Sequence, residues 1–154
     1  MDVHRNALLQ RLIAVGLSAP AVDWLLILWD MIQTLDDLTD GDPVTQGDIH
    51  RLVNNSLIGY ATHPFFTRNI SALTPVIANA IAKWTAANFL EGNGMVTEVS
   101  FVWRASYYDV VLQALICDVG YTLAIQRASQ VLEMYGESYS DYQQEFEACQ
   151  TRLS

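Results

Sequence analysis

Apolar residues recur every three or four positions along almost the whole chain, and this spacing constrains the fold more than any other feature of the sequence. The segment after residue 75 shows the pattern clearly, because Ile77, Ala80, Ile81, Trp84 and Ala87 fall on one side of a helix. No stretch alternates apolar and polar residues for long enough to predict a β-strand. The sequence therefore predicts an all-α fold.

Helix-breaking residues divide this pattern into about six to seven helices. Gly16 follows the first helix, and Gly41 with Pro43 ends the second. In the segment 98–119 the apolar residues cover most of a helix circumference, which predicts a central, enclosed helix there. Because 154 residues is a usual size for one domain, we expect residues 1–154 to form a single helical bundle.

Three short motifs predict where other helices begin. Thr45 with Asp48 three residues later resembles a capping box that uses the shorter acid. His63-Pro64 predicts a single turn that carries two phenylalanines. Thr74-Pro75 predicts the start of the next helix, because proline is tolerated in a first helical turn.

Composition excludes several classes of protein. Hydrophobic residues make up 51% of the chain and charged residues 16%, which is enough apolar material for a core and excludes general disorder. The net charge of −9 disfavours direct binding to nucleic acid or anionic lipid and favours a basic partner surface. The most apolar stretch, Trp24–Trp29, is too short to span a membrane. Since Met1–Gln10 is too polar for a secretory signal, we expect a cytoplasmic location.

An acidic run at the end of the second predicted helix stands out. Between Leu12 and His50 the chain has seven acidic residues and no lysine or arginine. On a helix Asp23, Asp30, Asp37 and Asp40 fall within one arc, opposite an apolar stripe. Carboxylates this late in a helix also oppose the negative end of its dipole, so a compensating positive charge is expected. The predicted partner-binding residues are Asp30, Asp36, Asp37 and Asp40.

Asp36-Asp37-Leu38-Thr39-Asp40 spells DDxxD, which resembles the aspartate-rich motif of isoprenoid diphosphate synthases. In that family the carboxylates hold magnesium ions that bind a substrate diphosphate. The resemblance implies that Asp36, Asp37 and Asp40 could bind magnesium, since hard divalent cations prefer carboxylate oxygens. It covers five residues, and no second acidic motif follows. An ordinary solvated helix face is the competing interpretation.

Arg104 lies in an otherwise apolar segment, where a buried arginine needs a carboxylate partner. We predict a structural ion pair with an acid such as Asp30, Asp37, Asp109 or Asp118, and we choose Asp109 as the predicted partner of Arg104. No catalytic residue is predicted, because the three histidines are scattered and no nucleophile pattern or glycine-rich phosphate loop is present.

The wider run WDxxQxxDDLxDGD, followed by HPFF, WTAAN, FVWRASYYDVVL and YGESYSDY, resembles small helical proteins of tailed bacteriophages. This resemblance implies expression inside a bacterial host and carries no activity to transfer. It favours an accessory protein that occupies a host or phage protein surface.

These observations support two hypotheses. In the first, the chain is a non-enzymatic interaction module that needs no cofactor, binds a basic host or phage protein through its acidic helix face, and can form a homodimer. In the second, it is a magnesium-dependent enzyme that acts on a phosphorylated or diphosphate substrate through the DDLTD motif, with Arg104 as a phosphate contact.

Overall fold

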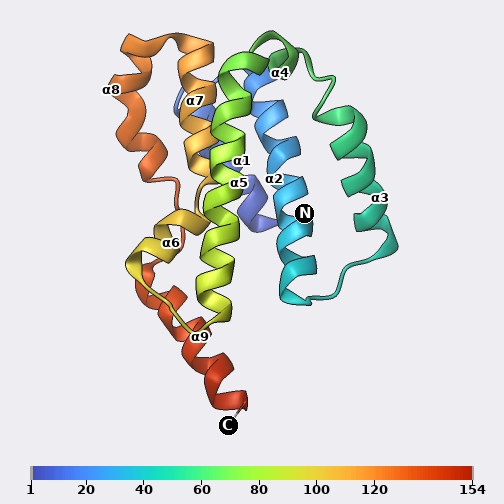
Figure 1. Cartoon of the computed structure of the whole chain (residues 1–154). Coiled ribbons are helices and arrows are strands. Elements are labelled where there is room, and N and C mark those ends of the chain that lie inside the picture. The colour runs from blue at the N-terminus through green and yellow to red at the C-terminus, as the bar shows by residue number, and fades with distance from the viewer. Residues whose placement is uncertain (1, 154) are drawn as a thin grey trace.

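The computed structural model describes residues 2–153, with the side chains of residues 2–148. The described residues form nine α-helices and one π-helical turn and contain no strand, which confirms the all-α prediction (Figure 1). The helix count exceeds the predicted range. In chain order the elements are α1 (Val3–Ala14), α2 (Ala19–Asp40), α3 (Gln46–Asn54), the π-helical turn η1 (Asn55–Gly59), α4 (Pro64–Arg68), α5 (Ile70–Gly92), α6 (Glu98–Arg104), α7 (Tyr107–Val119), α8 (Tyr121–Leu132) and α9 (Tyr139–Leu153).

The N-terminal half of α2 lies in the core. The helix begins after Ser18, whose backbone N–H and hydroxyl each donate to the Asp118 carboxylate at 2.7 Å. Trp24 is fully buried, and its ring packs on Tyr60 and Phe66 with centroid distances of 5.6 Å in both cases. The predicted turn at His63-Pro64 is thus the short helix α4, and its aromatic residues fill the core beside α2.

The central helix is α7, which packs against α2, α5 and α8. The segment 98–119, predicted as one helix, is divided at Ala105–Ser106 into α6 and α7. The Ser106 hydroxyl donates to the backbone carbonyl of Trp103, a local hydrogen bond that competes with helix continuation. α6 therefore turns away from α7, and its last residue, Arg104, is placed at the end of the space between α2 and α5.

Predictions of helix ends from local motifs were correct at two positions and wrong at a third. The capping box of Thr45 and Asp48 is present at the start of α3, as predicted. Gly41 ends α2 in the left-handed conformation, with φ of 77°. The predicted start of α5 at Thr74-Pro75 is wrong, because the helix begins at Ile70 and Pro75 lies inside it. The proline removes one intrahelical hydrogen bond, to the carbonyl of residue 71, which lies on the exposed surface.

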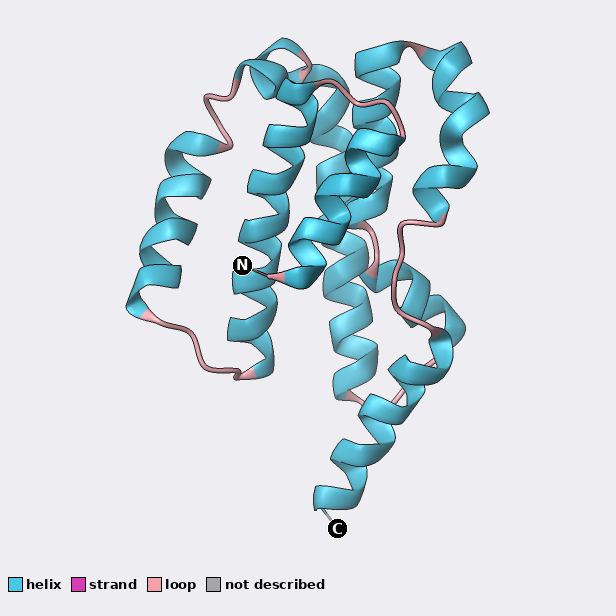
Figure 2. Cartoon of the chain, turned by 180° about the vertical axis from the view of Figure 1, so that it is seen from behind, coloured by secondary structure: helices cyan, strands magenta, loops and turns pink. Residues whose placement is uncertain are grey.

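The helices are arranged around α7 with α3 and α8 on opposite sides of the molecule (Figure 1). Seen from behind, α9 extends away from the rest of the bundle, whereas α1 lies across it (Figure 2). One set of buried side chains joins α1, α2, α4, α5, α7 and α8 into a common core. No described helix is both long and apolar enough to cross a membrane.

Candidate binding groove

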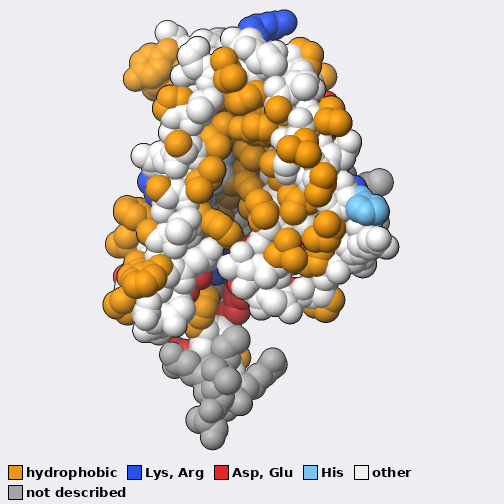
Figure 3. All heavy atoms as spheres, turned by 45° about the vertical axis from the view of Figure 1, so that its right-hand side comes forward, with side chains coloured by type: hydrophobic (Ala, Val, Ile, Leu, Met, Phe, Trp, Pro, Cys, Tyr) orange, Lys and Arg blue, Asp and Glu red, His pale blue; other side chains and the backbone are white. Residues whose placement is uncertain are grey.

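An apolar cavity of about 360 Å³ lies between α2 and α5, over α7. Space-filling atoms show it as a hollow lined by hydrophobic side chains, with acidic and basic atoms at its lower end (Figure 3). The residues that line it are Leu28, Met31, Ile32, Leu35, Tyr60, Ile77, Ala80, Ile81, Trp84, Arg104, Ser106, Tyr107 and Val110.

The cavity exists because its two walls share a floor without packing closely on each other. Both α2 and α5 pack against α7, and α2 and α5 are not a closely packed pair in the described part of the chain. The Trp84 indole N–H reaches across the gap and donates to Asp36 at 3.4 Å. Apolar side chains are left uncovered beside the cavity, since Leu35 on α2 is 42% exposed and Ile81 on α5 is 59% exposed.

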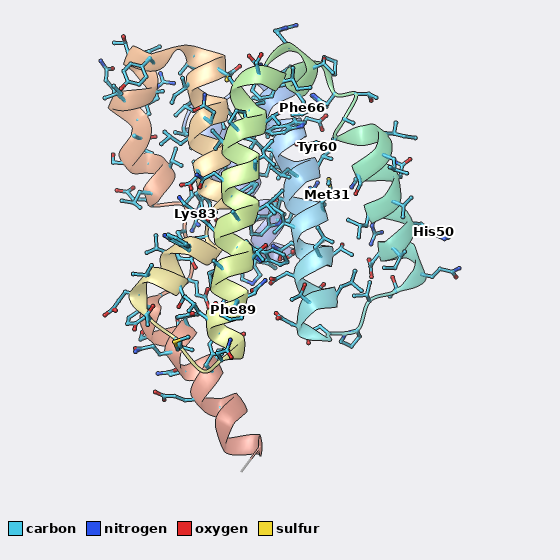
Figure 4. All side chains as sticks on the ribbon, in the orientation of Figure 1. Met31, His50, Tyr60, Phe66, Lys83 and Phe89 are labelled. Carbon is cyan, nitrogen blue, oxygen red and sulfur yellow. The ribbon has the colours of Figure 1, made fainter. Side chains whose placement is uncertain are left out.

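Helix α3 extends this apolar surface on the far side of α2. It contains no buried residue, and it continues into η1, where Leu57 and Ile58 are exposed. A second hollow of about 240 Å³ lies on this segment, between His50 and Ile58. In Figure 4, Met31 and Tyr60 lie beside α2, whereas His50 points outward from α3.

We call the cavity between α2 and α5, together with the exposed side chains beside it, the groove. One end of the groove is acidic and, among the described side chains, surrounds one guanidinium, that of Arg104. Arg104 Nη1 is 3.9 Å from Glu91 Oε1 and 4.0 Å from Glu145 Oε2, and this nitrogen is buried without a hydrogen-bond partner. The Arg104 guanidinium also lies over the Tyr142 ring, 5.1 Å from its centroid. The Tyr142 hydroxyl donates to Glu91 Oε1 at 3.0 Å and thereby fixes that carboxylate.

The carboxylates at this end influence one another. Burial raises the pKa of Glu91, while the Arg104 charge and the Tyr142 hydrogen bond oppose that rise. Partial burial and the neighbouring Asp36 likewise raise the pKa of Asp40, against the attraction of Arg104. Holding these groups ionised therefore costs free energy, which a cation placed beside them would lower.

The predicted acidic residues divide into three environments. Asp30 is paired within the chain, because Arg5 Nε and Nη2 donate to its two carboxylate oxygens at 2.7 and 2.9 Å. Asp36 and Asp40 lie on the side of α2 that faces Arg104. The pKa of Asp37 is raised by partial burial and by other carboxylates, first among them Asp42 in the following loop.

The three DDLTD carboxylates therefore do not converge on one site. Asp36 and Asp40 face the groove end, whereas Asp37 faces the loop toward α3. The described residues include no group of three or more histidine, cysteine, aspartate or glutamate side chains arranged to hold a metal ion. The donor set does not fit the magnesium cluster that the five-residue resemblance implies.

The predicted pairing of Arg104 with Asp109 is replaced by two other sets of contacts. Asp109 accepts from Lys83 Nζ at 2.8 Å, and Lys83 leaves α5 on the side away from α2 (Figure 4). Arg104 instead lies beside Glu91 and Glu145. Residues five positions apart on a continuous helix already project about 140° apart, and the break at Ala105–Ser106 places Arg104 and Asp109 on separate helices.

Two features of the groove were not predicted. Tyr142 and Glu145 come from α9, which sequence periodicity gave no reason to place beside α5. One feature of the sequence did indicate the groove. Trp84 and Ile81 belong to a helix that is apolar on several sides, and a single neighbouring helix cannot cover all of those sides. Comparison of the chain with protein-family models, curated proteins and solved structures finds no match.

Proposed function

We propose that this protein is a non-enzymatic interaction module that binds a basic partner protein through the C-terminal end of α2 and the groove beside it. The observation that carries the proposal concerns Asp36, Asp37 and Asp40. Among the described side chains, no lysine or arginine forms an ion pair with any of the three. Asp30, which was predicted with them, is left out because Arg5 already compensates its charge.

Stability alone does not account for these carboxylates. They occupy the last two turns of α2, where the helix dipole disfavours negative charge. Leu35 and Leu38 lie among them with 42% and 47% of their surfaces exposed. A surface that is both acidic and apolar matches a partner that is both basic and apolar.

The proposal also includes the cellular location of the protein and the source of its partner. A small acidic protein of the phage type would act in the cytoplasm of a bacterial host and occupy a basic surface of a host or phage protein. Its net charge of −9 would speed the encounter with such a surface and make the association sensitive to salt.

A pair of charge-matched variants tests this function. Asp37→Asn with Asp40→Asn removes two charges from the end of α2, and Glu98→Gln with Glu133→Gln removes two exposed charges elsewhere. Each protein is immobilised and exposed to bacterial lysate at low salt and at about 0.5 M salt, where charges are screened within a few ångströms. Retained proteins are identified by mass spectrometry.

We expect the wild type and the Glu98/Glu133 variant to retain the same basic proteins at low salt and to lose them at high salt. The Asp37/Asp40 variant should lose them under both conditions. Equal retention by all three proteins would show that the end of α2 is an ordinary solvated surface.

A further inference from the structure

The apolar surface of the groove extends beyond its cavity. The cavity holds about 360 Å³, near the lower limit of about 300 Å³ for small-molecule pockets. A molecule confined to it would leave Leu38 and much of Ile81 in water, because these side chains are 47% and 59% exposed. An elongated occupant is needed to cover the cavity and its rim together.

The walls of the groove favour a helix as that occupant. α2 and α5 are long helices of 22 and 23 residues that both rest on α7. Their facing surfaces present rows of apolar side chains, which accept the ridge of a third helix. The described residues offer no strand edge to which an extended peptide could add.

The charges at the groove end define the polar part of the occupant. The carboxylates of Glu91 and Glu145 lie around Arg104, and Glu137 also attracts its guanidinium electrostatically. Asp36 and Asp40 approach from α2, so that five carboxylates accompany one guanidinium among the side chains that the structure describes. An anionic group would be repelled there, whereas a lysine or arginine would lower the energy of the whole group.

We propose that the groove binds an amphipathic helix of the partner protein, with the apolar face of that helix over the cavity and a basic side chain at the carboxylates of Asp36, Asp40, Glu91 and Glu145. This inference rests on the proposed function, since it names the part of the basic partner that α2 and α5 receive. Hydrophobic contact anchors the helix, and charge sets its position along the groove.

A synthetic helix serves as the probe. It has about 20 residues, or about 30 Å of helix, with leucine and phenylalanine spaced three and four apart and lysines on the opposite face. One control peptide carries glutamates in place of the lysines, and another has the same composition in scrambled order. Binding is measured by fluorescence anisotropy of the labelled peptide.

Two protein variants separate the groove from the rest of the surface. Ile81→Ser changes an exposed side chain that lines the cavity, and Ile125→Ser changes a matched side chain on α8 that lines neither the cavity nor the second hollow on α3 and η1. Their exposed fractions are 59% and 56%, so neither change should unfold the protein. Circular dichroism verifies that both variants keep their helix content.

We expect the lysine peptide to bind the wild type and Ile125→Ser equally and to bind Ile81→Ser about tenfold more weakly. The glutamate and scrambled peptides should bind at least about tenfold more weakly than the lysine peptide. Equal binding to both serine variants, together with weaker binding to the Asp37/Asp40 variant, would overturn the groove inference and leave the proposed function standing.

Other occupants would give different results. Binding of the glutamate peptide as tightly as the lysine peptide would contradict the predicted partner chemistry. A wild-type dimer in sedimentation that becomes a monomer on Ile81→Ser would show that a second copy of the chain covers the groove. If no peptide bound and the Asp37/Asp40 variant still retained every lysate protein, both proposals would fail.

Discussion

The two halves of α2 differ in almost every physical property, although they belong to one continuous helix. In the N-terminal half, Trp24 and Leu25 are fully buried, and at the middle of the helix the charge of Asp30 is compensated by Arg5. In the C-terminal half, Leu35 and Leu38 are exposed beside carboxylates that have no ion-pair partner among the described side chains. The first half packs within the core, whereas the second half exposes apolar side chains and carboxylates without an ion pair among the described side chains.

We therefore expect stability and partner binding to depend on different halves of α2. A segment whose apolar side chains are buried and whose charges are paired contributes to the free energy of unfolding through contacts within the chain. An exposed apolar and acidic segment gains little there and would gain more on contact with a partner. Substitutions in the first half should therefore lower stability, and substitutions in the second half should change binding with little effect on stability.

The largest effect is expected at Trp24. Trp24→Ala would remove a fully buried ring that packs on Tyr60 and Phe66, and should lower the free energy of unfolding by about 3–5 kcal/mol. Leu38→Ala, in the exposed half, should change it by at most about 0.5 kcal/mol. Urea unfolding followed by circular dichroism measures both.

Trp24→Phe sharpens this test. The indole N–H of Trp24 is buried without a hydrogen-bond partner, so its loss removes an unsatisfied polar group along with some packing. We expect Trp24→Phe to cost much less stability than Trp24→Ala. Similar losses for Leu38→Ala and Trp24→Ala would mean that the two halves of α2 do not differ as described.

A smaller effect is expected from the ion pair that joins α1 to α2. Asp30→Ala leaves Arg5 without its two hydrogen bonds, and should cost about 1 kcal/mol because both side chains are about one-third exposed. A double-mutant cycle with Arg5→Ala isolates the coupling between the two residues. A coupling energy near zero would show that solvent compensates Asp30 as well as Arg5 does.

The features that the sequence predicted correctly are those that local chemistry determines. The capping box of Thr45 and Asp48 and the end of α2 at Gly41 each involve residues a few positions apart, so one segment contains all the groups that form them. The helical period of α2 likewise follows from the order of its own side chains. These local contacts do not depend on where the rest of the chain lies.

The features that were missed depend on how distant helices are placed. The pairing of Asp30 with Arg5 spans 25 positions, and Tyr142 lies 51 positions from Glu91. No periodicity specifies these distances, because many arrangements of helices satisfy the same apolar pattern. To predict the groove, it would have been necessary to know that α2 and α5 both pack on α7 without packing closely on each other.

Removing charge from the exposed half should increase stability slightly. Asp37→Asn with Asp40→Asn takes negative charge from the end of the helix dipole, and we expect a gain of about 0.3 kcal/mol for each exposed site. The Glu98→Gln and Glu133→Gln control should give no net gain, since the loss at Glu98, in the first turn of α6, opposes the gain at Glu133, the C-cap of α8. A loss of stability in the Asp37/Asp40 variant would imply that these carboxylates have partners within the chain.

The smallest effect is expected in the pH dependence of stability, and it tests the same carboxylates without mutation. The pKa values of Asp37, Asp40 and Glu91 are raised in the folded protein, chiefly by burial. Each group therefore takes up a proton on the folded chain before the unfolded chain does, so these three groups should increase the free energy of unfolding as the pH falls from neutral toward the ordinary carboxyl range near 4. In the Asp37→Asn, Asp40→Asn variant this rise should be smaller, because only Glu91 of the three still titrates. Urea unfolding of both proteins across that range measures the difference, and equal pH profiles would contradict the assignment of raised pKa values to the end of α2.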